Sequence, residues 1–253
     1  MLKQAKRHQD ILEQLSQCGF ASTEELVAQL DVSPQTIRRD LNELAEQGKV
    51  LRHHGGASLP SNSLELAPSA GPQAEMISRL ARFIAQQIPD GASLFLSSGP
   101  LIEGVARALL DHRDLRIVTT NLNVASLLTA RDDFQVYVSG GLVCNRDGQL
   151  QGANGYDFLR QFQMDYCLLQ ACALERHGQL LGCDEHSVRN EQAMIRQSRQ
   201  VWVAVLPQAM TTRGMFHLAD ATQLSQLYFA ETPTRVWQQE LAALNLRWQS
   251  CLV

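Results

Sequence analysis

Three groups of apolar residues recur at helical spacing within the first fifty positions of the chain. The groups are Ile11, Leu12 and Leu15; Leu26, Val27 and Leu30; and Ile37, Leu41 and Leu44. Residues three or four apart lie on one face of a helix, so each group predicts an amphipathic helix that packs against its neighbours. The first helix is expected to end near Gly19, and a strand over residues 50–53 that runs into a glycine turn follows the third.

Both ends of the third helix are specified by the sequence. Ser33 can accept hydrogen bonds from free backbone N–H groups, Pro34 suits the first helical position because no donor is needed there, and Gly48 can close the far end. Upstream, residues 22–25 (Ser-Thr-Glu-Glu) form a capping box, and residues 31–32 supply a tight turn. A short helix, a turn and a capped helix together predict a helix-turn-helix, whose second helix enters the major groove of DNA.

The side of the third helix that points away from the apolar stripe is suited to reading DNA. Arginine can form two hydrogen bonds to guanine, glutamine or asparagine can do so to adenine, and hydroxyls and amides can contact phosphates. The strand and glycine turn that follow are typical of a basic wing, which an ordinary amphipathic surface helix would not require. The predicted DNA-binding residues are Ser22, Thr23, Ser33, Pro34, Gln35, Thr36, Arg38, Arg39, Asn42, Arg52, His53, His54, Gly55 and Gly56.

Residues 58–74 are rich in Ser, Pro, Gly and Asn, and predict a linker in which Pro60, Pro68 and Pro72 exclude regular helix or strand pairing. Beyond a further helix that ends at Pro89, short apolar runs alternate with amphipathic helices. This rhythm predicts parallel βαβ units. Strands are expected at 92–96, 115–119, 134–138, 166–171, 201–206, 226–230 and 244–248, and helices at 101–110, 123–130 and 185–198.

The sequence therefore predicts an α+β winged helix-turn-helix over residues 1–57, a linker over 58–74, and an α/β domain with a mainly parallel sheet over 75–253. Ligands of such sheets bind beyond the carboxyl ends of the strands. Four loops occupy that position: 97–100, 119–121, 139–141 and 182–184. Their glycines and hydroxyls can present N–H groups to a phosphate, but every βα unit also needs such turns. The residues alone leave both interpretations open.

Residues 3–57 closely resemble the winged helix of the DeoR family of bacterial repressors, through residues 22–26, 32–41 and 51–57, and a weaker resemblance continues through the rest of the chain. It implies a repressor of a sugar or polyol catabolic regulon that binds operator DNA and is controlled by a phosphorylated sugar or polyol. It also implies that the second domain folds like ribose-phosphate isomerases and CoA transferases, senses the effector and oligomerises. The effector-binding positions implied by the resemblance are Ser97, Ser98, Gly99, Thr120, Asn121, Gly140, Gly141, Asp184, His186 and Arg189.

At several pocket positions this chain differs from the family pattern, and these differences remove groups suited to binding a phosphate. The loop Ser97-Ser98-Gly99-Pro100 stands where relatives carry Asp-x-Gly-Thr, so an acid is lost and Pro100 removes a backbone donor. Ser187 and Glu191 stand where relatives carry an acid and a lysine, and a glutamate in place of a lysine reverses the sign of its interaction with an anion.

A second pair of replacements lies near the next strand end, where Leu206 and Ala209 take the places of an aspartate and a lysine. Arg189 is then the clearest cation near the pocket, with Arg213 as a substitute. Our hypothesis is that the DNA-reading half is intact, whereas the sensing half binds a less anionic ligand or has lost small-molecule control. The alternative is that other residues of the pocket preserve the phosphorylated ligand.

The positions of the basic residues support DNA binding, whereas the net charge does not. The formal net charge is −4, and residues 1–57 carry seven Lys and Arg against eight Asp and Glu. However, Arg38, Arg39, Lys49 and Arg52 all lie on the predicted reading helix and wing, where the local field matters more than the sum. Because each chain can make few phosphate contacts, tight binding is expected to need a homo-oligomer, a dimer or a tetramer.

The six cysteines form no C-x-x-C pair and no zinc-like spacing with histidine, so no metal, disulfide or cofactor is expected. No apolar run is long enough to span a bilayer, and the first residues lack the apolar core of a signal peptide, so we expect a cytoplasmic protein. Two rival functions remain. One is a sugar-phosphate isomerase or transferase, which the losses at Ser187, Leu206 and Ala209 disfavour. The other is a ligand-independent DNA binder whose larger domain only oligomerises.

Overall fold

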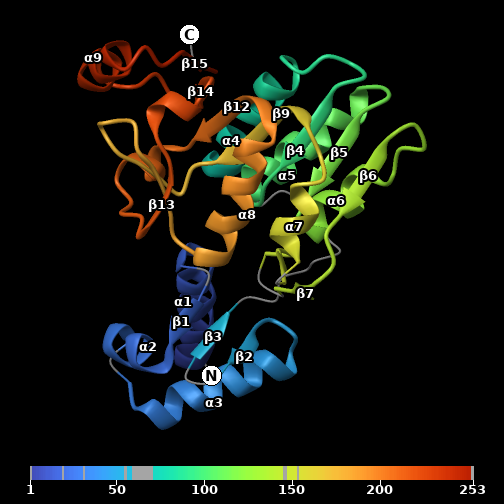
Figure 1. Ribbon diagram of the computed structural model, residues 1–253. Coiled ribbons are helices and arrows are strands. Elements are labelled where there is room, and N and C mark those ends of the chain that lie inside the picture. Colours follow the sequence, from blue (N-terminus) through green and yellow to red (C-terminus); the bar gives the residue numbers. More distant parts are fainter. Residues whose placement is uncertain are drawn as a thin grey trace. The chain divides into compact units, whose positions relative to one another are not determined.

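The computed structural model describes residues 2–18, 20–30, 32–53, 56–58, 71–144, 147–152 and 154–251 (Figure 1). The chain divides into two compact units, residues 1–65 and residues 66–253. Each unit has its own hydrophobic core. Among the described residues, no helix has the length and apolar character needed to cross a membrane.

The first unit packs three helices against a small antiparallel sheet of order β1-β3-β2. Its elements are α1 (Leu2–Cys18), β1 (Phe20–Ser22), α2 (Thr23–Leu30), α3 (Pro34–Glu46), β2 (Leu51–His53) and β3 (Gly56–Ser58). The three predicted helices are confirmed, and their apolar stripes meet in one core that includes Ile11, Leu26 and Leu41, each fully buried. Strand β1 was not predicted, because three residues are too few to show an alternating pattern.

The second unit is built on a seven-stranded sheet of order β15-β14-β12-β9-β4-β5-β6, in which every neighbouring pair is parallel. The strands are β4 (Ser93–Leu96), β5 (Arg116–Thr119), β6 (Gln135–Val138), β9 (Met164–Gln170), β12 (Ser198–Val205), β14 (Gln226–Phe229) and β15 (Trp248–Ser250). All four residues of β4 are buried. Alternate residues of this strand contribute to different cores, Leu94 and Leu96 to one and Phe95 to the other. Both faces of the sheet are therefore covered, as parallel sheets require.

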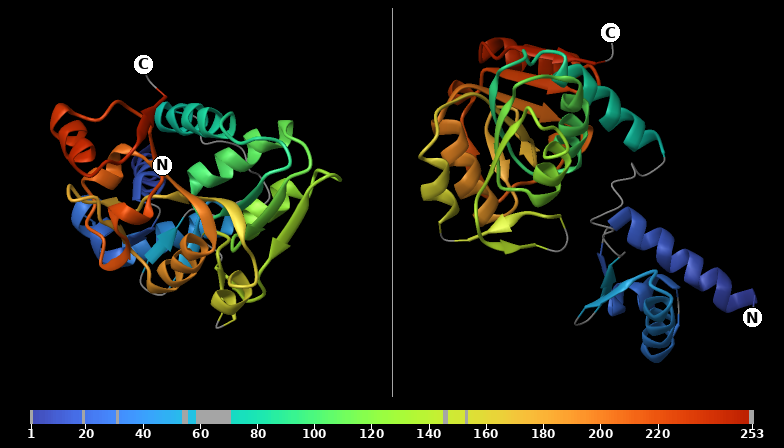
Figure 2. Two further views of the ribbon diagram at one scale, coloured as in Figure 1. Left: turned by 45° about the horizontal axis from the view of Figure 1, so that its top comes forward. Right: turned by 90° about the vertical axis from the view of Figure 1, so that its right-hand side faces the viewer.

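Helices lie on both faces of this sheet (Figure 2). They are α4 (Pro72–Ala85), α5 (Pro100–Ala108), α6 (Leu122–Leu128), α7 (Gly155–Leu159), α8 (Glu185–Arg196) and α9 (Arg235–Ala243), with short 3₁₀ turns η1 (Leu109–Asp111), η2 (Pro207–Met210) and η3 (Ala221–Gln223). Buried residues of α4, α5 and α6 share the core of Leu94 and Leu96, whereas those of α8 and α9 share the core of Phe95. The predicted fold class, a winged helix followed by a parallel α/β domain, is confirmed.

The second unit also contains two smaller antiparallel sheets, which were not predicted. One is a sheet of order β10-β11-β13, and the other is the hairpin β7-β8. Their strands are β7 (Leu142–Val143), β8 (Leu150–Gln151), β10 (Ala173–Leu174), β11 (Leu180–Gly182) and β13 (Phe216–Ala219). Most of these strands have two or three residues, so their pairing depends on tertiary contacts and leaves little pattern in the sequence.

Three expectations are corrected. Pro72 does not interrupt regular structure but begins α4 at its first turn, where its missing N–H costs nothing; residues 59–70 of the predicted linker lie outside the described residues. The strand expected at 244–248 is wrong, because Leu244 ends α9 and the strand begins at Trp248. A disulfide joins Cys172 to Cys183, although the cysteine spacing predicted none.

Candidate functional site: a DNA-reading helix and a sensor pocket

Helix α3 is fixed at both ends by the residues that the sequence singled out. The Ser33 side chain accepts a hydrogen bond from the backbone N–H of Thr36 at 3.2 Å, and Pro34 occupies the first turn. At the far end Gly48 adopts a φ of 68°, a left-handed conformation that favours glycine, and its N–H donates to the carbonyl of Ala45 at 2.9 Å. The start and the end of the reading helix are thus set by local interactions.

The supporting helix α2 begins with the predicted capping box. The backbone N–H of Ser22 donates to Glu25 Oε2 at 2.8 Å, and the backbone N–H of Glu25 donates to Ser22 Oγ at 3.1 Å. The neighbouring Thr23 is only 8 % exposed, so it offers little surface to DNA. The Ser22 hydroxyl also donates to Glu25 Oε2 at 2.9 Å, so within this protein it serves the helix cap.

The two sides of α3 differ sharply in exposure. Ile37, Asp40, Leu41 and Leu44 are buried. The residues predicted to read DNA lie on the other side: Ser33, Pro34, Gln35, Arg38, Arg39 and Asn42 are exposed, and Thr36 is half-buried. This side therefore presents guanidinium, amide and hydroxyl groups to solvent along one helix.

Sequence reasoning missed the polar anchor on the buried side of α3. The carboxylate of Asp40, 1 % exposed, is bound through both oxygens by the guanidinium of Arg7 on α1, and His8 Nε2 lies 3.2 Å from its Oδ1. Burial alone would raise the pKa of Asp40, but the hydrogen bond and charge of Arg7, with help from His8, outweigh it and lower that pKa. Nothing in the helical periodicity distinguishes this aspartate from a solvent-facing one.

A group of possible metal ligands lies at the same place, where ligand atoms of His8, Asp40 and Glu43 come within 4.8 Å of one another. Both Asp40 oxygens are already bound by Arg7, and Gln4 Nε2 donates to Glu43 Oε2 at 2.7 Å. A guanidinium in contact with the carboxylate disfavours a cation there, so we interpret this group as a structural ion-pair network.

The wing follows α3 as a short antiparallel pair. Arg52 on β2 pairs with Ala57 on β3, and His53 pairs with Gly56. Arg52 is exposed and Gly56 is buried. The predicted wing residues His54 and Gly55 lie outside the described residues.

Three of the predicted effector-binding loops, 97–100, 119–121 and 139–141, follow the carboxyl ends of β4, β5 and β6, which are neighbours in the sheet. Ser97, Thr120, Asn121 and Ser139 at these ends are all at least 95 % buried. Among the described residues, the hydroxyls of Ser98 and Ser139 have no hydrogen-bond partner. The loops 97–100, 119–121 and 139–141 thus follow neighbouring strands, with polar atoms that a ligand or water could satisfy. The position predicted for the fourth loop, 182–184, is wrong, because this loop follows β11 of the antiparallel β10-β11-β13 sheet and not a strand of the parallel sheet.

The three helices that follow predicted effector-binding loops have their first N–H groups occupied by side chains. At α5, where Pro100 has no N–H, the N–H of Leu101 donates to Gln170 Oε1 at 2.9 Å. At α6, the N–H of Val124 donates to Asn121 Oδ1 at 3.1 Å. At α8, the N–H of Ser187 donates to Asp184 Oδ2 at 2.7 Å. Helix N-termini bind phosphates through such groups, so these interactions compete with an anion.

Glu191 lies on α8, near Asp184 and Ser97. Burial and the negative charge of Asp184 raise the pKa of Glu191 to about 8, although Ser97 partly opposes the shift. At neutral pH this side chain is therefore mostly a neutral acid. Among the departures noted in the sequence, Leu206 and Ala209 are buried and Arg213 is exposed.

Two of the predicted effector-binding residues, His186 and Arg189, lie on α8. A pocket of about 380 Å³ brings His186 and Arg189 together, both exposed on this helix. Of the predicted effector-binding positions this pocket includes only these two, so it is separate from the buried Ser97, Thr120 and Asn121 at the ends of β4 and β5. The lining residues are Leu142, Gln151, Gly152, Tyr156, His186, Arg189 and Asn190.

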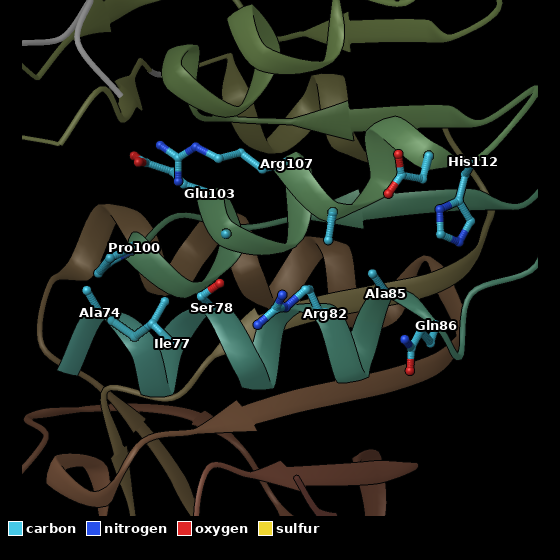
Figure 3. A pocket seen from close by; sticks show the side chains of 13 residues that line it. Ala74, Ile77, Ser78, Arg82, Ala85, Gln86, Pro100, Glu103, Arg107 and His112 are labelled. Atoms are coloured by element: carbon cyan, nitrogen blue, oxygen red, sulfur yellow. The ribbon is translucent and has the colours of Figure 1, made fainter. Parts of the chain in front are cut away.

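A separate pocket of about 560 Å³ lies between α4 and α5 and contains none of the predicted site residues. Figure 3 shows Glu103 and Arg107 on α5 and Ile77, Ser78 and Arg82 on α4 among the residues that line this pocket. Both charge signs are present along this groove, and nothing in its geometry selects one ligand.

Comparisons with known proteins agree with this division of the chain. Residues 7–63 match the family model "DeoR-like helix-turn-helix domain", and residues 73–229 match "DeoR C terminal sensor domain". The chain is 42 % identical to the glycerol-3-phosphate regulon repressor of Escherichia coli, over 99 % of this chain and 100 % of that one. It is 32 % identical to the HTH-type transcriptional repressor CsqR of Escherichia coli, over 93 % and 91 %.

Solved structures with a similar fold include ribose 5-phosphate isomerase A from Methanocaldococcus jannaschii. It is 12 % identical, with a TM-score of 0.40, and the alignment covers 54 % of each chain.

Proposed function

Because the chain belongs to the DeoR family of bacterial transcriptional repressors, we propose that it represses a glycerol-3-phosphate-type catabolic regulon by binding operator DNA through α3 and the wing. The observation that supports this most directly is the exposed polar side of α3, with Gln35, Arg38, Arg39 and Asn42 on a helix whose other side is buried. The family consists of regulators and not enzymes, so the isomerase-like fold of the second unit carries no catalysis here.

Two further parts of the proposal concern partners. One α3 offers few phosphate contacts, so we propose that two or more subunits bind one operator, with the second unit joining them. Operator binding also implies that the protein works in the cytoplasm, beside the bacterial chromosome.

The effector is proposed to bind at the sheet edge formed by Ser97, Thr120, Asn121 and Ser139. The relatives are named for glycerol 3-phosphate, but here the three helix N-termini are capped by side chains and a half-buried acid, Glu191, lies beside the site. These features support weakened phosphate binding, with a less anionic ligand or none. In the alternative, where glycerol 3-phosphate is still the effector, the exposed side chains of His186 and Arg189 would have to bind its phosphate.

Selection of bound DNA from a random pool by the full-length chain tests the proposal. We expect enrichment of one sequence with two half-sites, and loss of that enrichment in Arg38→Ala. Binding of the selected DNA is then measured with and without glycerol 3-phosphate, and a change in affinity would identify this compound as an effector. No enriched sequence from the intact, folded protein would contradict operator binding, whatever the effector does.

A further inference from the structure

The disulfide between Cys172 and Cys183 closes the open end of a β-hairpin beside the sensor pocket. Strands β10 and β11 pair through Ala173 and Leu181 and through Leu174 and Leu180. Cys172 directly precedes this hairpin and Cys183 directly follows it, with their Cα atoms 6.4 Å apart. That separation lies within the range that disulfides need, so the backbone holds the two cysteines ready to bond.

Contacts other than this bond also hold the hairpin. Ala173, Leu174 and Leu180 are at most 2 % exposed and belong to the core of the second unit. At the closed end of the hairpin, the N–H of Glu175 donates to the carbonyl of Gln179 at 2.9 Å. Apolar burial and backbone pairing would therefore keep the hairpin in place with both thiols reduced.

The bridge is also accessible to small molecules. Cys183 is exposed and Cys172 is half-buried, so a dithiol can attack the Cys183 sulfur. Cys167, on β9 of the parallel sheet, provides a contrast, because it is fully buried and burial raises the pKa of its thiol well above the usual value. A buried, protonated thiol reacts slowly.

The two chain segments that the bridge joins carry polar groups of the sensor pocket. Two residues before Cys172, Gln170 accepts the N–H of Leu101 at the start of α5. One residue after Cys183, Asp184 caps α8 by accepting the N–H of Ser187. The Ser187 hydroxyl in turn donates to Gln149 Oε1 at 3.0 Å. The bond thus ties the start of α8 to the segment that holds the loop after β4.

We propose that Cys172 and Cys183 form a thiol–disulfide modification site, closed by hydroperoxides and opened by dithiol reductants, which sets how firmly the start of α8 is held at the sensor pocket. This goes beyond the repressor function, because no step requires the sugar or polyol effector. Disulfides in compartments that keep thiols reduced are usually transient and redox-sensing, and a DNA-binding regulator works in such a compartment.

The chemistry balances with the two thiols and one peroxide. A cysteine thiolate attacks the peroxide oxygen, giving a sulfenic acid and releasing the alcohol or water. The second thiolate attacks the sulfenic sulfur, forms the S–S bond and displaces hydroxide, which leaves as water. Two electrons pass from the thiols to the peroxide. In the reverse direction, one thiolate of a dithiol attacks Cys183, Cys172 leaves as a thiolate, and the second thiol of the reductant resolves the mixed disulfide.

Differential alkylation of the full-length protein, read by peptide mass spectrometry, tests the chemistry. After hydrogen peroxide, we expect Cys172 and Cys183 to resist alkylation as a linked pair. After dithiothreitol, both should be alkylated. Cys183→Ser should abolish the linked peptide, and Cys251→Ser, at a free and half-buried cysteine, should leave it unchanged. A pair that stays reduced under excess peroxide would overturn the proposal.

Amide hydrogen exchange of residues 184–190 tests the structural consequence without DNA or effector. We expect exchange about fivefold faster or more in the reduced protein than in the oxidised one, with Cys183→Ser matching the reduced protein under both conditions. The comparison of one wild-type sample in two redox states needs no variant to fold. Equal exchange in the two states would show that the bond does not act on α8. Because neither readout involves operator binding, failure here is distinguishable from failure of the repressor function.

Discussion

The guanidinium of Arg7 on α1 binds both carboxylate oxygens of Asp40, which is buried on the inner side of α3. This ion pair connects the first helix to the reading helix. It lies opposite the exposed residues of α3, so it can orient that helix without occupying its DNA-reading side. Helix orientation and DNA contact can therefore be tested separately.

Arg7→Ala should destabilise the first unit. The substitution leaves the Asp40 carboxylate buried with only His8 nearby, and removing one partner of a buried charge is expected to cost about 2 to 3 kcal/mol. Chemical denaturation followed by circular dichroism measures the loss. The matched control is Arg39→Ala, which removes an exposed pair with Glu43 and should change stability by less than about 0.5 kcal/mol. Equal effects of the two substitutions would contradict a special role for the buried pair.

Arg38→Ala and Arg39→Ala should weaken operator binding while leaving the fold intact. A residue that reads a base edge is expected to contribute about 1 to 3 kcal/mol, and a residue on phosphate should lower the salt slope by about one unit. Titrations of labelled operator at several salt concentrations distinguish these cases. Arg199→Ala, at an exposed position in the second unit, serves as the control. Unaltered operator affinity in both α3 variants would refute the assignment of α3 to the groove.

Stability should depend on pH through Glu191. Its pKa is raised from 4.5 to about 8 in the folded protein, so the folded state holds this proton more tightly than the unfolded state. The stabilisation is fully present below pH 4.5 and is lost as the pH rises through about 8. Glu191→Gln removes this dependence. Thermal melts should show the variant gaining stability relative to wild type as the pH rises from 5 to 9, and a constant difference across this range would contradict the assignment.

Glycerol 3-phosphate should bind weakly to the wild type and more tightly to Glu191→Lys. The substitution replaces an acid beside the pocket with a cation, which favours an anionic ligand, and we expect about a tenfold gain or more. Isothermal titration of the full-length proteins measures it, with the exposed Glu231→Lys as a control for net charge. Saturable micromolar binding by the wild type would overturn the hypothesis of weakened phosphate recognition.

Residues 1–65 should fold alone but bind the operator far less tightly than the full chain. This unit has its own core, whereas subunit association is assigned to the second unit. Loss of linked binding should weaken affinity by about 100-fold or more. Fluorescence anisotropy with the selected operator compares the two proteins, and circular dichroism confirms that the fragment is folded. An unchanged affinity would exclude the second unit from operator binding.

The helices and strands that could be predicted from the sequence were the longer ones. The capped helix α3 and the buried strands β4, β5 and β14 were located within two residues, because each has a strong local pattern. The strands of the β10-β11-β13 sheet were missed, because each is too short to show a clear pattern and because β11 pairs with the distant β13. The strand at Trp248 was misplaced because the apolar residues around Leu244 finish a helix instead.

At the candidate sites too, features that depend on local sequence were predicted, and contacts between distant residues were not. Residue type and helical spacing were enough to predict which side of α3 is exposed, whereas the burial of Asp40 against Arg7 joins positions 33 residues apart. The resemblance to DeoR repressors predicts the effector-binding loops, and this stays a prediction. It could not show that the Gln170 side chain accepts a hydrogen bond from the N–H of Leu101, 69 residues away.

The sequence by itself determined the helix-turn-helix and the alternation of strands and helices, because these depend on neighbouring residues and on residue type. Only the tertiary structure decided the Arg7–Asp40 pair, the raised pKa of Glu191 and the closeness of Cys172 to Cys183. Each of these depends on a distance or a degree of burial that arises when separate segments pack together. Neither quantity can be predicted from residues that are neighbours in the sequence.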